Sequence, residues 1–550
     1  MKRKFLYGSL VALTLLLTAC GGENDSKSAE SKGKETAKVE QKIAISSPAP
    51  MSTLDTTQTT DKNTFTMVQH LFEGLTRFDS ETNPVPGIAE KIDVSEDGKI
   101  YTFTLREDAK WSNGDTITAH DFEYAWKRLI NPETQGPNAY LLDNVENSLA
   151  VRTGEKSVDE VGFKANSDTE FQVNLINPQA SFLAVIAIGW LAPQQEKFVE
   201  ETGDVFGTNS ESILYNGPFV LTNWDGTSDT WTLEKNEAYY DADAVKLEEI
   251  DVQTLKEENT GINLYQSDEL DLVRISGQYV AEYKEDPGFT NYSDVANNFL
   301  DFNKEEGSPL ANVNVRKAIA LAIDKDSLTE NVLADGSKAL NGLVPANLYA
   351  NPETKEDYRA YAGEFLTYDL DAAKDYWKKA QKEVGDKVEV TLLAADTDSG
   401  KKVSEYLQSQ LEEALPGLSI TVNQQPSINV NQSRRDKNYE MSLSGWIAGS
   451  SEMDSYYNLY ATGSSYNYGN YDNSEYTKLV NAAKSTDAAD PNKQFKDYQQ
   501  AEKILLEEDA TQVPVYQSAS NYLINTKIKN VEFPLYGGYF FLRNAEVVED

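Results

Sequence analysis

The sequence predicts a mixed α/β fold, in which strands and helices alternate irregularly along the chain. Residues 100–105 alternate apolar and polar side chains with the period of a half-buried strand. Residues 372–380 and 403–415 instead space their apolar side chains as helices do. No internal repeat is present. This mixture favours α+β and α/β lobes over a sandwich or a helix bundle.

Further elements follow the same logic along the chain. We expect additional strands at residues 42–45, 171–175, 388–393 and 513–516, and additional helices at 64–75, 118–129, 313–322 and 495–506. Asn113-Gly114-Asp115 predicts a turn, after which Thr118 caps a helix that Asn131-Pro132 ends. Because proline cannot donate to a ladder, Pro514 predicts that its strand lies at a sheet edge.

Composition excludes several classes of protein. The chain has 550 residues, with 50 Lys and Arg against 89 Asp and Glu, and a net charge of −39, which disfavours binding to a phosphate backbone. One cysteine cannot form a disulfide framework, and His70, His120 and Cys20 are too few for a zinc site. A hydrophobic content of 39% argues against disorder, and the length suggests two to four domains.

The amino terminus predicts export and anchoring. Residues 2–4 are basic, and Phe5–Ala19 is an apolar run of 15 residues, shorter than a membrane-spanning helix requires. Residues 1–19 therefore form a secretory signal. Leu17-Thr18-Ala19-Cys20 resembles a bacterial lipobox, which implies cleavage before Cys20 and lipidation of its thiol. The alternative is a signal with a chance cysteine, although no second cysteine exists as a disulfide partner.

Residues 20–42 are then a lipidated cysteine followed by a polar, flexible linker. No later apolar stretch approaches membrane length, since the longest, Phe182–Ala192, has 11 residues. We expect a soluble body that is lipid-anchored at the extracellular face of the cytoplasmic membrane.

Signatures of catalysis are scarce. The sequence contains no Walker loop, no G-x-S-x-G and no H-E-x-x-H motif, and its two histidines leave little imidazole for acid–base chemistry. We expect neither an enzyme nor a bound cofactor or metal. A glycosidase-type carboxylate pair stays open, because 89 acids form close pairs by chance and the many aromatic residues suit a sugar cleft.

Four groups of motifs carry a family resemblance. They are His70-Leu71-Phe72-Glu73-Gly74-Leu75 with Pro86-Gly87-Ile88-Ala89-Glu90; residues 101–106 with 109–114 and 118–122; Asn216-Gly217-Pro218-Phe219 with residues 233–236 and 239–240; and residues 315–318 with 322–325. In this order they resemble the oligopeptide- and dipeptide-binding extracellular receptors of peptide ABC importers, known as solute-binding protein family 5. The resemblance covers residues 40–550.

The resemblance implies a periplasmic-binding-protein-like fold with two hinged lobes and an extra third lobe. Lobe I would comprise residues 43–72, 213–298 and 515–550; the extra lobe residues 73–212; and lobe II residues 299–514. The two main lobes would close on an extended peptide, which pairs with backbone groups as an added strand. Such a receptor delivers its ligand to permease subunits, and we expect a monomer that binds no nucleic acid.

The resemblance also implies contact residues. In lobe I the ligand would meet Thr60, Asp61 and Lys62 on an opposing strand. Elsewhere it would meet the side chains of Tyr265, Asp301, Asn303, Arg434 and Tyr516, and the segment Gly445, Trp446, Ile447, Ala448 and Gly449. The ordinary alternatives are that Trp446 belongs to the core and that Arg434 is a surface residue beside Arg435.

Departures from the family pattern concern the charges that read peptide ends. The position of the acid that holds the peptide amine is Gly449 here, and the cations for the carboxylate align with Leu333, Gly400 and Leu443. Pocket tyrosines align with Asn138 and Ser518. Because a buried charge without a partner is costly, we expect longer, apolar or signalling peptides bound mainly through backbone contacts. Glu452 or Asp454 are the candidates to replace the missing acid.

Other ligands of the same fold stay open as alternatives. Relatives bind oligosaccharides and nickel complexes, and exposed Trp and Tyr suit sugars, whereas the shortage of histidine disfavours nickel. An anchored extracellular hydrolase is a third, less favoured alternative.

Overall fold

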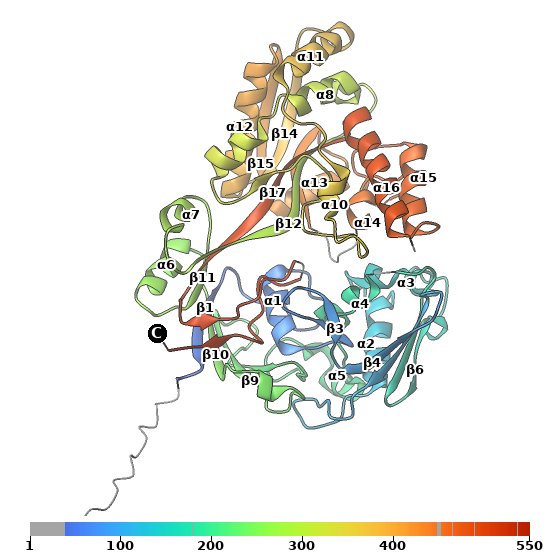
Figure 1. Ribbon diagram of the computed structural model, residues 1–550, viewed down its shortest axis with the longest axis vertical. Helices are drawn as coiled ribbons and strands as arrows, with labels where there is room; N and C mark the ends of the chain where they lie inside the picture. The colour runs from blue at the N-terminus through green and yellow to red at the C-terminus, as the bar shows by residue number, and fades with distance from the viewer. Residues whose placement is uncertain are drawn as a thin grey trace, which may run out of the picture. The chain divides into compact units, whose positions relative to one another are not determined.

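The structure is a computed structural model that describes residues 39–179, 181–447, 453–464, 466–488, 490–535 and 537–549. From Glu40 onward these residues belong to one compact unit. The predicted signal, Cys20 and most of the linker lie outside the described residues. Strands and helices are mixed throughout the described unit (Figure 1), which confirms the α/β prediction.

Among the described residues, eleven strands form one continuous sheet. Ten follow one another in the spatial order β15 (Leu418–Gln425), β14 (Val388–Ala395), β16 (Met441–Ile447), β12 (Phe289–Phe302), β17 (Gln512–Ile524), β11 (Leu272–Ile275), β1 (Lys42–Ser47), β10 (Glu249–Thr254), β9 (Thr230–Lys235) and β8 (Phe219–Thr222). The eleventh, β13 (Lys338–Ala339), pairs with β17. In β1 the alternation predicted from the sequence buries Ile43 and Ile45.

The long strands β12 and β17 connect the two sides of this sheet, and they run side by side in Figure 1. They pair antiparallel from Phe289 opposite Leu523 to Asp301 opposite Gln512. The register shifts between Ser293 and Asn297, so residues 294–296 bulge out of β12. Because a bulge interrupts the ladder and bends its strand, the strand pair is expected to bend most easily there.

A large apolar core packs on the β14–β16 side and gathers buried residues between Val295 and Tyr516. Its main helices are α8 (Val313–Leu321), α10 (Tyr358–Ala362), α11 (Leu370–Val384), α12 (Asp398–Ala414), α14 (Asp454–Tyr457), α15 (Ser474–Lys484) and α16 (Pro491–Glu502). The helix α12 contacts both β14 and β15. A shorter helix, α9 (Lys325–Ser327), leads into a π-helical turn that ends at Leu333.

A second core gathers buried residues between Leu75 and Leu191. It lies against a four-stranded antiparallel sheet in the order β4 (Ala89–Val94), β5 (Ile100–Leu105), β7 (Glu170–Asn174) and β6 (Phe163–Ser167), which α2 (Ala119–Ile130) contacts. A small cluster involves α6 (Glu258–Gln266) and α7 (Gln278–Tyr283). The predicted lobe boundaries stay a prediction.

Shorter elements complete the described unit. They are α1 (Lys62–Leu71), α3 (Ser148–Arg152), α4 (Phe182–Val185), α5 (Glu196–Thr202), α13 (Ser427–Arg435), β2 (Thr76–Phe78), β3 (Pro84–Pro86), β18 (Ile528–Lys529) and β19 (Glu546–Val547). The predicted cap of α2 is present, because Thr118 and Asp121 form a capping box at its first turn.

The predicted helix at 64–75 ends earlier than expected. Helix α1 stops at Leu71, and Phe72 is already extended. The side chain of Asn216 explains the stop, because it accepts the N–H of Glu73 at 3.1 Å and donates to the C=O of Glu73 at 2.9 Å. These two bonds hold the backbone of Glu73 in an extended, non-helical path.

The prediction that Pro514 marks an edge strand is wrong. Its strand β17 lies in the middle of the sheet, between β12 and β11. Pro514 lies opposite Phe299 at a second register shift, while β13 and β11 pair only with later residues of β17. The missing N–H of Pro514 is therefore tolerated at a local gap in the ladder.

Candidate functional site

The second half of β16 has one unpaired side. All residues from Met441 to Ile447 pair with β12, but β14 pairs only with Met441 and Ser442. Residues 443–447, which we call the β16 edge, have no strand on their other side among the described residues. Since alternate residues of an antiparallel strand direct N–H and C=O away from its partner, the β16 edge offers backbone groups to an added strand.

Exposed apolar side chains accompany the β16 edge. The ring of Trp446 lies 5.2 Å from that of Tyr466 in an edge-to-face arrangement. Ile447 and Tyr466 expose 49% and 41% of their surface. The predicted contacts Gly445, Trp446 and Ile447 thus present main-chain groups beside apolar surface, to which Tyr466 adds an aromatic ring that was not predicted. Trp446 is only partly packed against the core. Ala448 and Gly449 lie outside the described residues.

Thr60, Asp61 and Lys62 do not form the expected strand. Thr60 is exposed, and Asp61 is the extended N-cap of α1, whose Oδ1 accepts the N–H of Thr64 at 2.8 Å. This cap starts the helix at Lys62, so an extended backbone cannot continue past Asp61. Any contact from Lys62 therefore comes from the start of a helix and not from a strand.

The structure brings Asp301 and Arg434 together. Nη2 of Arg434, in α13, donates to Oδ2 of Asp301 at 3.2 Å, and the hydroxyl of Tyr439 donates to the same oxygen at 3.1 Å. Asp301 is 2% exposed, and burial with this carboxylate nearby raises the pKa of Tyr439. Asn303 is also buried and donates to the C=O groups of Lys437 and Tyr439. All three predicted residues therefore tie residues 434–439 to β12.

Tyr265 and Tyr516 lie in different apolar clusters. Tyr265, in α6, donates its hydroxyl to Oδ1 of Asp286 at 3.3 Å and packs against the small cluster. Tyr516, in β17, is 7% exposed and belongs to the large core. Burial raises the pKa of both phenols.

The residues at the positions where the family pattern has charges for the peptide ends are packed against the rest of the protein. Leu333 and Leu443 are buried, and a Cβ on Gly400 would lie 2.3 Å from the carbonyl oxygen of Ala395. Asn138 is buried and donates to the C=O of Thr59, and Ser518 is half-buried. Of the two candidate acids, Glu452 lies outside the described residues and Asp454 has Lys484 at 3.7 Å.

A cationic cluster surrounds Tyr539, and Lys62 is its only member that the sequence singled out. Nζ of Lys62 lies 4.5 Å from the Tyr539 ring centre, and the guanidinium of Arg274 in β11 lies 5.0 Å from it. Nζ of Lys62 is also 4.0 Å from Oδ1 of Asp294, in the bulge of β12. We call these four residues the Tyr539 cluster. Apart from Lys62, its only sequence signal is one charged residue within the apolar strand Leu272–Ile275.

The side chain of Lys62 is largely surrounded by protein but is still partly exposed to solvent. About a third of the side chain is exposed, at 30%, yet burial among dense protein lowers the pKa of its ammonium. Arg274 lowers that pKa further, whereas Asp294 opposes the shift.

Comparison with known families decides the assignment. Residues 83–468 match the model for the bacterial extracellular solute-binding proteins, family 5. The chain belongs to this family. The resemblance carried by its sequence motifs is therefore confirmed, as is the binding-protein fold that it implied.

Relatives of this family 5 member share its whole length. A dipeptide-binding protein of Lactococcus lactis subsp. cremoris is 34% identical, over 100% of both chains. The structure titled Listeria monocytogenes OppA bound to peptide has a TM-score of 0.80 at 35% identity and covers 93% of this chain and 100% of its own. The pheromone receptor PrgZ, solved to show its mode of peptide binding, has a TM-score of 0.80 at 34% identity with the same coverage.

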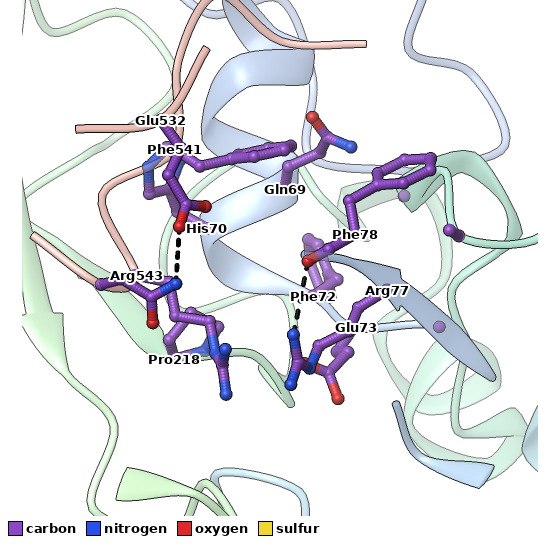
Figure 2. A pocket seen from close by; sticks show the side chains of 14 residues that line it. Gln69, His70, Phe72, Glu73, Arg77, Phe78, Pro218, Glu532, Phe541 and Arg543 are labelled. Atoms are coloured by element: carbon purple, nitrogen blue, oxygen red, sulfur yellow. Dashed lines mark hydrogen bonds and ion pairs between the residues drawn. The ribbon is translucent and has the colours of Figure 1, made fainter. Parts of the chain in front are cut away.

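A separate hollow lies at the end of α1 (Figure 2). It contains about 560 Å³ of space including its open mouth, and Phe72, Glu73, Arg77, Phe541 and Arg543 are among its walls. Its polar groups are largely engaged with their neighbours. Tyr239 and Tyr240 donate to Glu73, whose pKa is raised by burial, and Nδ2 of Asn544 donates to Oε1 of Glu532 at 2.7 Å. None of the predicted ligand residues lines this hollow.

The described residues contain neither a candidate metal site nor a candidate membrane span. No group of three or more His, Cys, Asp or Glu side chains that could hold a metal ion occurs within them. None of their helices is both long enough and apolar enough to cross a membrane.

Proposed function

We propose that this chain is an extracellular receptor that captures an extended oligopeptide and delivers it to an ABC permease. The β16 edge carries the proposal, because an unpaired strand side next to exposed apolar side chains is what strand addition requires. The peptide-bound structures among the relatives support it. Backbone pairing reads no sequence, so one receptor accepts many peptides.

Apolar or longer peptides are the preferred class in this proposal. Leu333, Gly400 and Leu443 supply no charge for a peptide end, and Trp446, Ile447 and Tyr466 offer apolar contacts beside the β16 edge. PrgZ, a pheromone receptor, shows that signalling peptides are within the range of such relatives.

Calorimetry with one apolar peptide tests this reading. The peptide is titrated with free ends and with its amine acetylated and its carboxylate amidated. Binding of the doubly capped peptide is expected. Complete loss of binding on capping would show that free termini are required and that the preference is wrong.

A variant of the β16 edge tests the site itself. Trp446→Ala removes the largest side chain on that edge, and we expect peptide affinity to fall about tenfold, as for a central aromatic contact. Unchanged affinity would remove the edge from the site. Tyr368→Ala, on an exposed ring outside β16, is the control.

Oligosaccharide binding is the second candidate, which the exposed ring of Tyr466 beside Trp446 favours. Mass spectrometry of ligand carried through purification decides between the two, and a thermal-shift screen of peptides against oligosaccharides repeats the decision. An anchored hydrolase would release altered ligand in the same experiment, whereas a receptor releases it unchanged.

Anchoring through a lipidated Cys20 completes the proposal. It rests on the lipobox-like segment and on the basic and apolar residues before it. In cells, Cys20→Ala should leave the precursor uncleaved and unlipidated; lipid labelling that persists in this variant would refute the anchor.

A further inference from the structure

Arg274 is unusual among the arginines of the described residues. Its side chain alone among them has neither a hydrogen bond nor an ion pair with a described residue, and its buried Nε has no partner there. The contact that holds it is the ring of Tyr539, 5.0 Å away. A guanidinium carries five donors, and burying donors without acceptors is costly. This side chain is therefore prepared for an acceptor that the described chain does not provide.

Lys62 adds a second cation to the same ring. Its nearest carboxylate oxygen, on Asp294, is 4.0 Å away, which is long for a charge-assisted hydrogen bond. The other oxygen of Asp294 accepts the hydroxyl of Ser520 at 2.9 Å. Asp61, the acid at the start of α1, already accepts the N–H of Thr64 and the hydroxyl of Ser52. Both acids are thus engaged elsewhere, and both cations remain incompletely paired.

The cluster lies in line with the β16 edge. Ile447, the last residue of that edge, pairs with Ala296, and Asp294 follows two residues further along β12. Both residues belong to the bulge of β12. A peptide that extends past Ile447 therefore runs toward Asp294 and the two cations beside it. The exposed part of Lys62 gives such a ligand access.

We propose that Arg274 and Lys62 bind a carboxylate of the peptide, either its C-terminus or an acidic side chain. This inference rests on the proposed peptide-binding function and adds a specificity determinant to it. The planar guanidinium suits a bidentate carboxylate. Since the chain as a whole carries −39, its long-range field repels anions, and selectivity for a carboxylate has to come from local contacts such as these.

Calorimetry with four acetylated six-residue peptides tests the proposal. Two are built of valine and glycine and end in a free carboxylate or an amide; the other two end in an amide and carry one internal glutamate or glutamine. The ratio of affinities within each pair measures carboxylate preference. Wild-type protein, Arg274→Gln, Arg274→Lys and the control Arg435→Gln, which removes an exposed arginine of α13, are compared.

We expect at least one wild-type ratio to favour the carboxylate by about tenfold to a hundredfold, as for a hydrogen bond between charged groups. Arg274→Gln should bring that ratio close to one, Arg274→Lys should restore part of it, and Arg435→Gln should retain it. The pair that responds identifies which carboxylate is bound. A merely structural role for Arg274 would lower stability without changing either ratio.

Two results overturn the inference. One is a wild-type protein that binds the amidated peptides but prefers neither carboxylate. The other is a preference that survives in Arg274→Gln. If Arg274→Gln does not fold, the affinity ratios of the wild-type protein and of Arg274→Lys still show whether a carboxylate is preferred. A wild-type protein that binds none of the four peptides would instead overturn the proposed function itself.

Discussion

Two guanidinium groups in this protein have opposite surroundings. Arg359, in the large core, donates to both carboxylate oxygens of Glu502, and Nη2 also donates to the C=O of Gly363 at 2.6 Å. Arg274, in the Tyr539 cluster, has an aromatic ring but no acceptor among the described residues. The first arrangement holds a fold together. The second contributes nothing comparable to the fold, which is the property expected of a group that serves a ligand.

The largest expected effect comes from breaking the Arg359 pair. Glu502→Gln leaves the guanidinium buried without its counter-charge and also perturbs the hydroxyls of Tyr358 and Tyr457. We expect a loss of about 3–5 kcal/mol in the free energy of unfolding, measured by urea denaturation. Glu507→Gln, on a solvated face, is the control. Equal stability of the two variants would show that the Arg359–Glu502 pair does not stabilise the fold.

Acid pH should lower the stability of the fold through a second buried group, His70. Its Nδ1–H donates to the C=O of Thr66, while Nε2 accepts the N–H of Leu542, so only the neutral ring fits. Burial lowers the pKa of His70 to about 4, against roughly 6.5 in the unfolded chain. The folded state therefore binds fewer protons between these values, and stability is lost as the pH falls through them, by about 3 kcal/mol at pH 4.

Urea denaturation of wild type and His70→Gln between pH 7 and 4 checks this effect. The variant should be less stable at pH 7 but should lose less stability on acidification. His120→Gln, at an exposed histidine, is the matched variant. Parallel pH profiles for wild type and His70→Gln would contradict the assigned pKa.

A smaller effect is expected at the acid beside the Tyr539 cluster. Asp61→Ala removes the N-cap of α1 and should cost about 1 kcal/mol in unfolding free energy. Asp490→Ala removes the corresponding cap of α16 and should cost a similar amount. Of the two, only Asp61 lies near the cationic cluster, so a loss of carboxylate preference in Asp61→Ala would mean that the cluster depends on the helix start.

The smallest effect is expected for Arg274 itself. Since no described residue accepts its hydrogen bonds, Arg274→Gln should change the free energy of unfolding by less than about 0.5 kcal/mol in the absence of ligand. Thermal denaturation of the ligand-free protein measures it. A loss of unfolding free energy as large as that of Glu502→Gln would show that Arg274, like Arg359, stabilises the fold.

Local signals in the sequence predicted most of the elements. Alternation in residues 100–105, the cap at Thr118 and the helical spacing of residues 403–415 all act within a few residues of the feature they specify. The end of α1 could not be predicted in this way, because Asn216 fixes it from 143 residues further along the chain. The central position of β17 could not be predicted either. It depends on where β11, β12 and β13 pair with it, and these pairings leave the missing N–H of Pro514 without a required partner.

Part of the candidate site could likewise be predicted from the sequence, and part could not. The resemblance placed Trp446 and Ile447 on what proves to be an unpaired strand side, and it directed attention to Lys62. It did not indicate Arg274, because a single arginine in a short apolar strand looks like many others. Only the folded chain shows that Lys62 and Arg274, from α1 and β11, share one ring contributed by residue 539.

The central place of β17 has a consequence for how the protein matures. β1, from the first described residues, reaches β12 only through β11 and β17, and β17 begins at Gln512. A chain emerging from its amino terminus can therefore complete its four-stranded sheet early, but it cannot close the main sheet until nearly all residues are available. Pairings between such distant segments form slowly. Until they form, the edges of β11 and β12 that face β17 are unpaired, and that interval is when the newly synthesised chain is most exposed to proteolysis and aggregation.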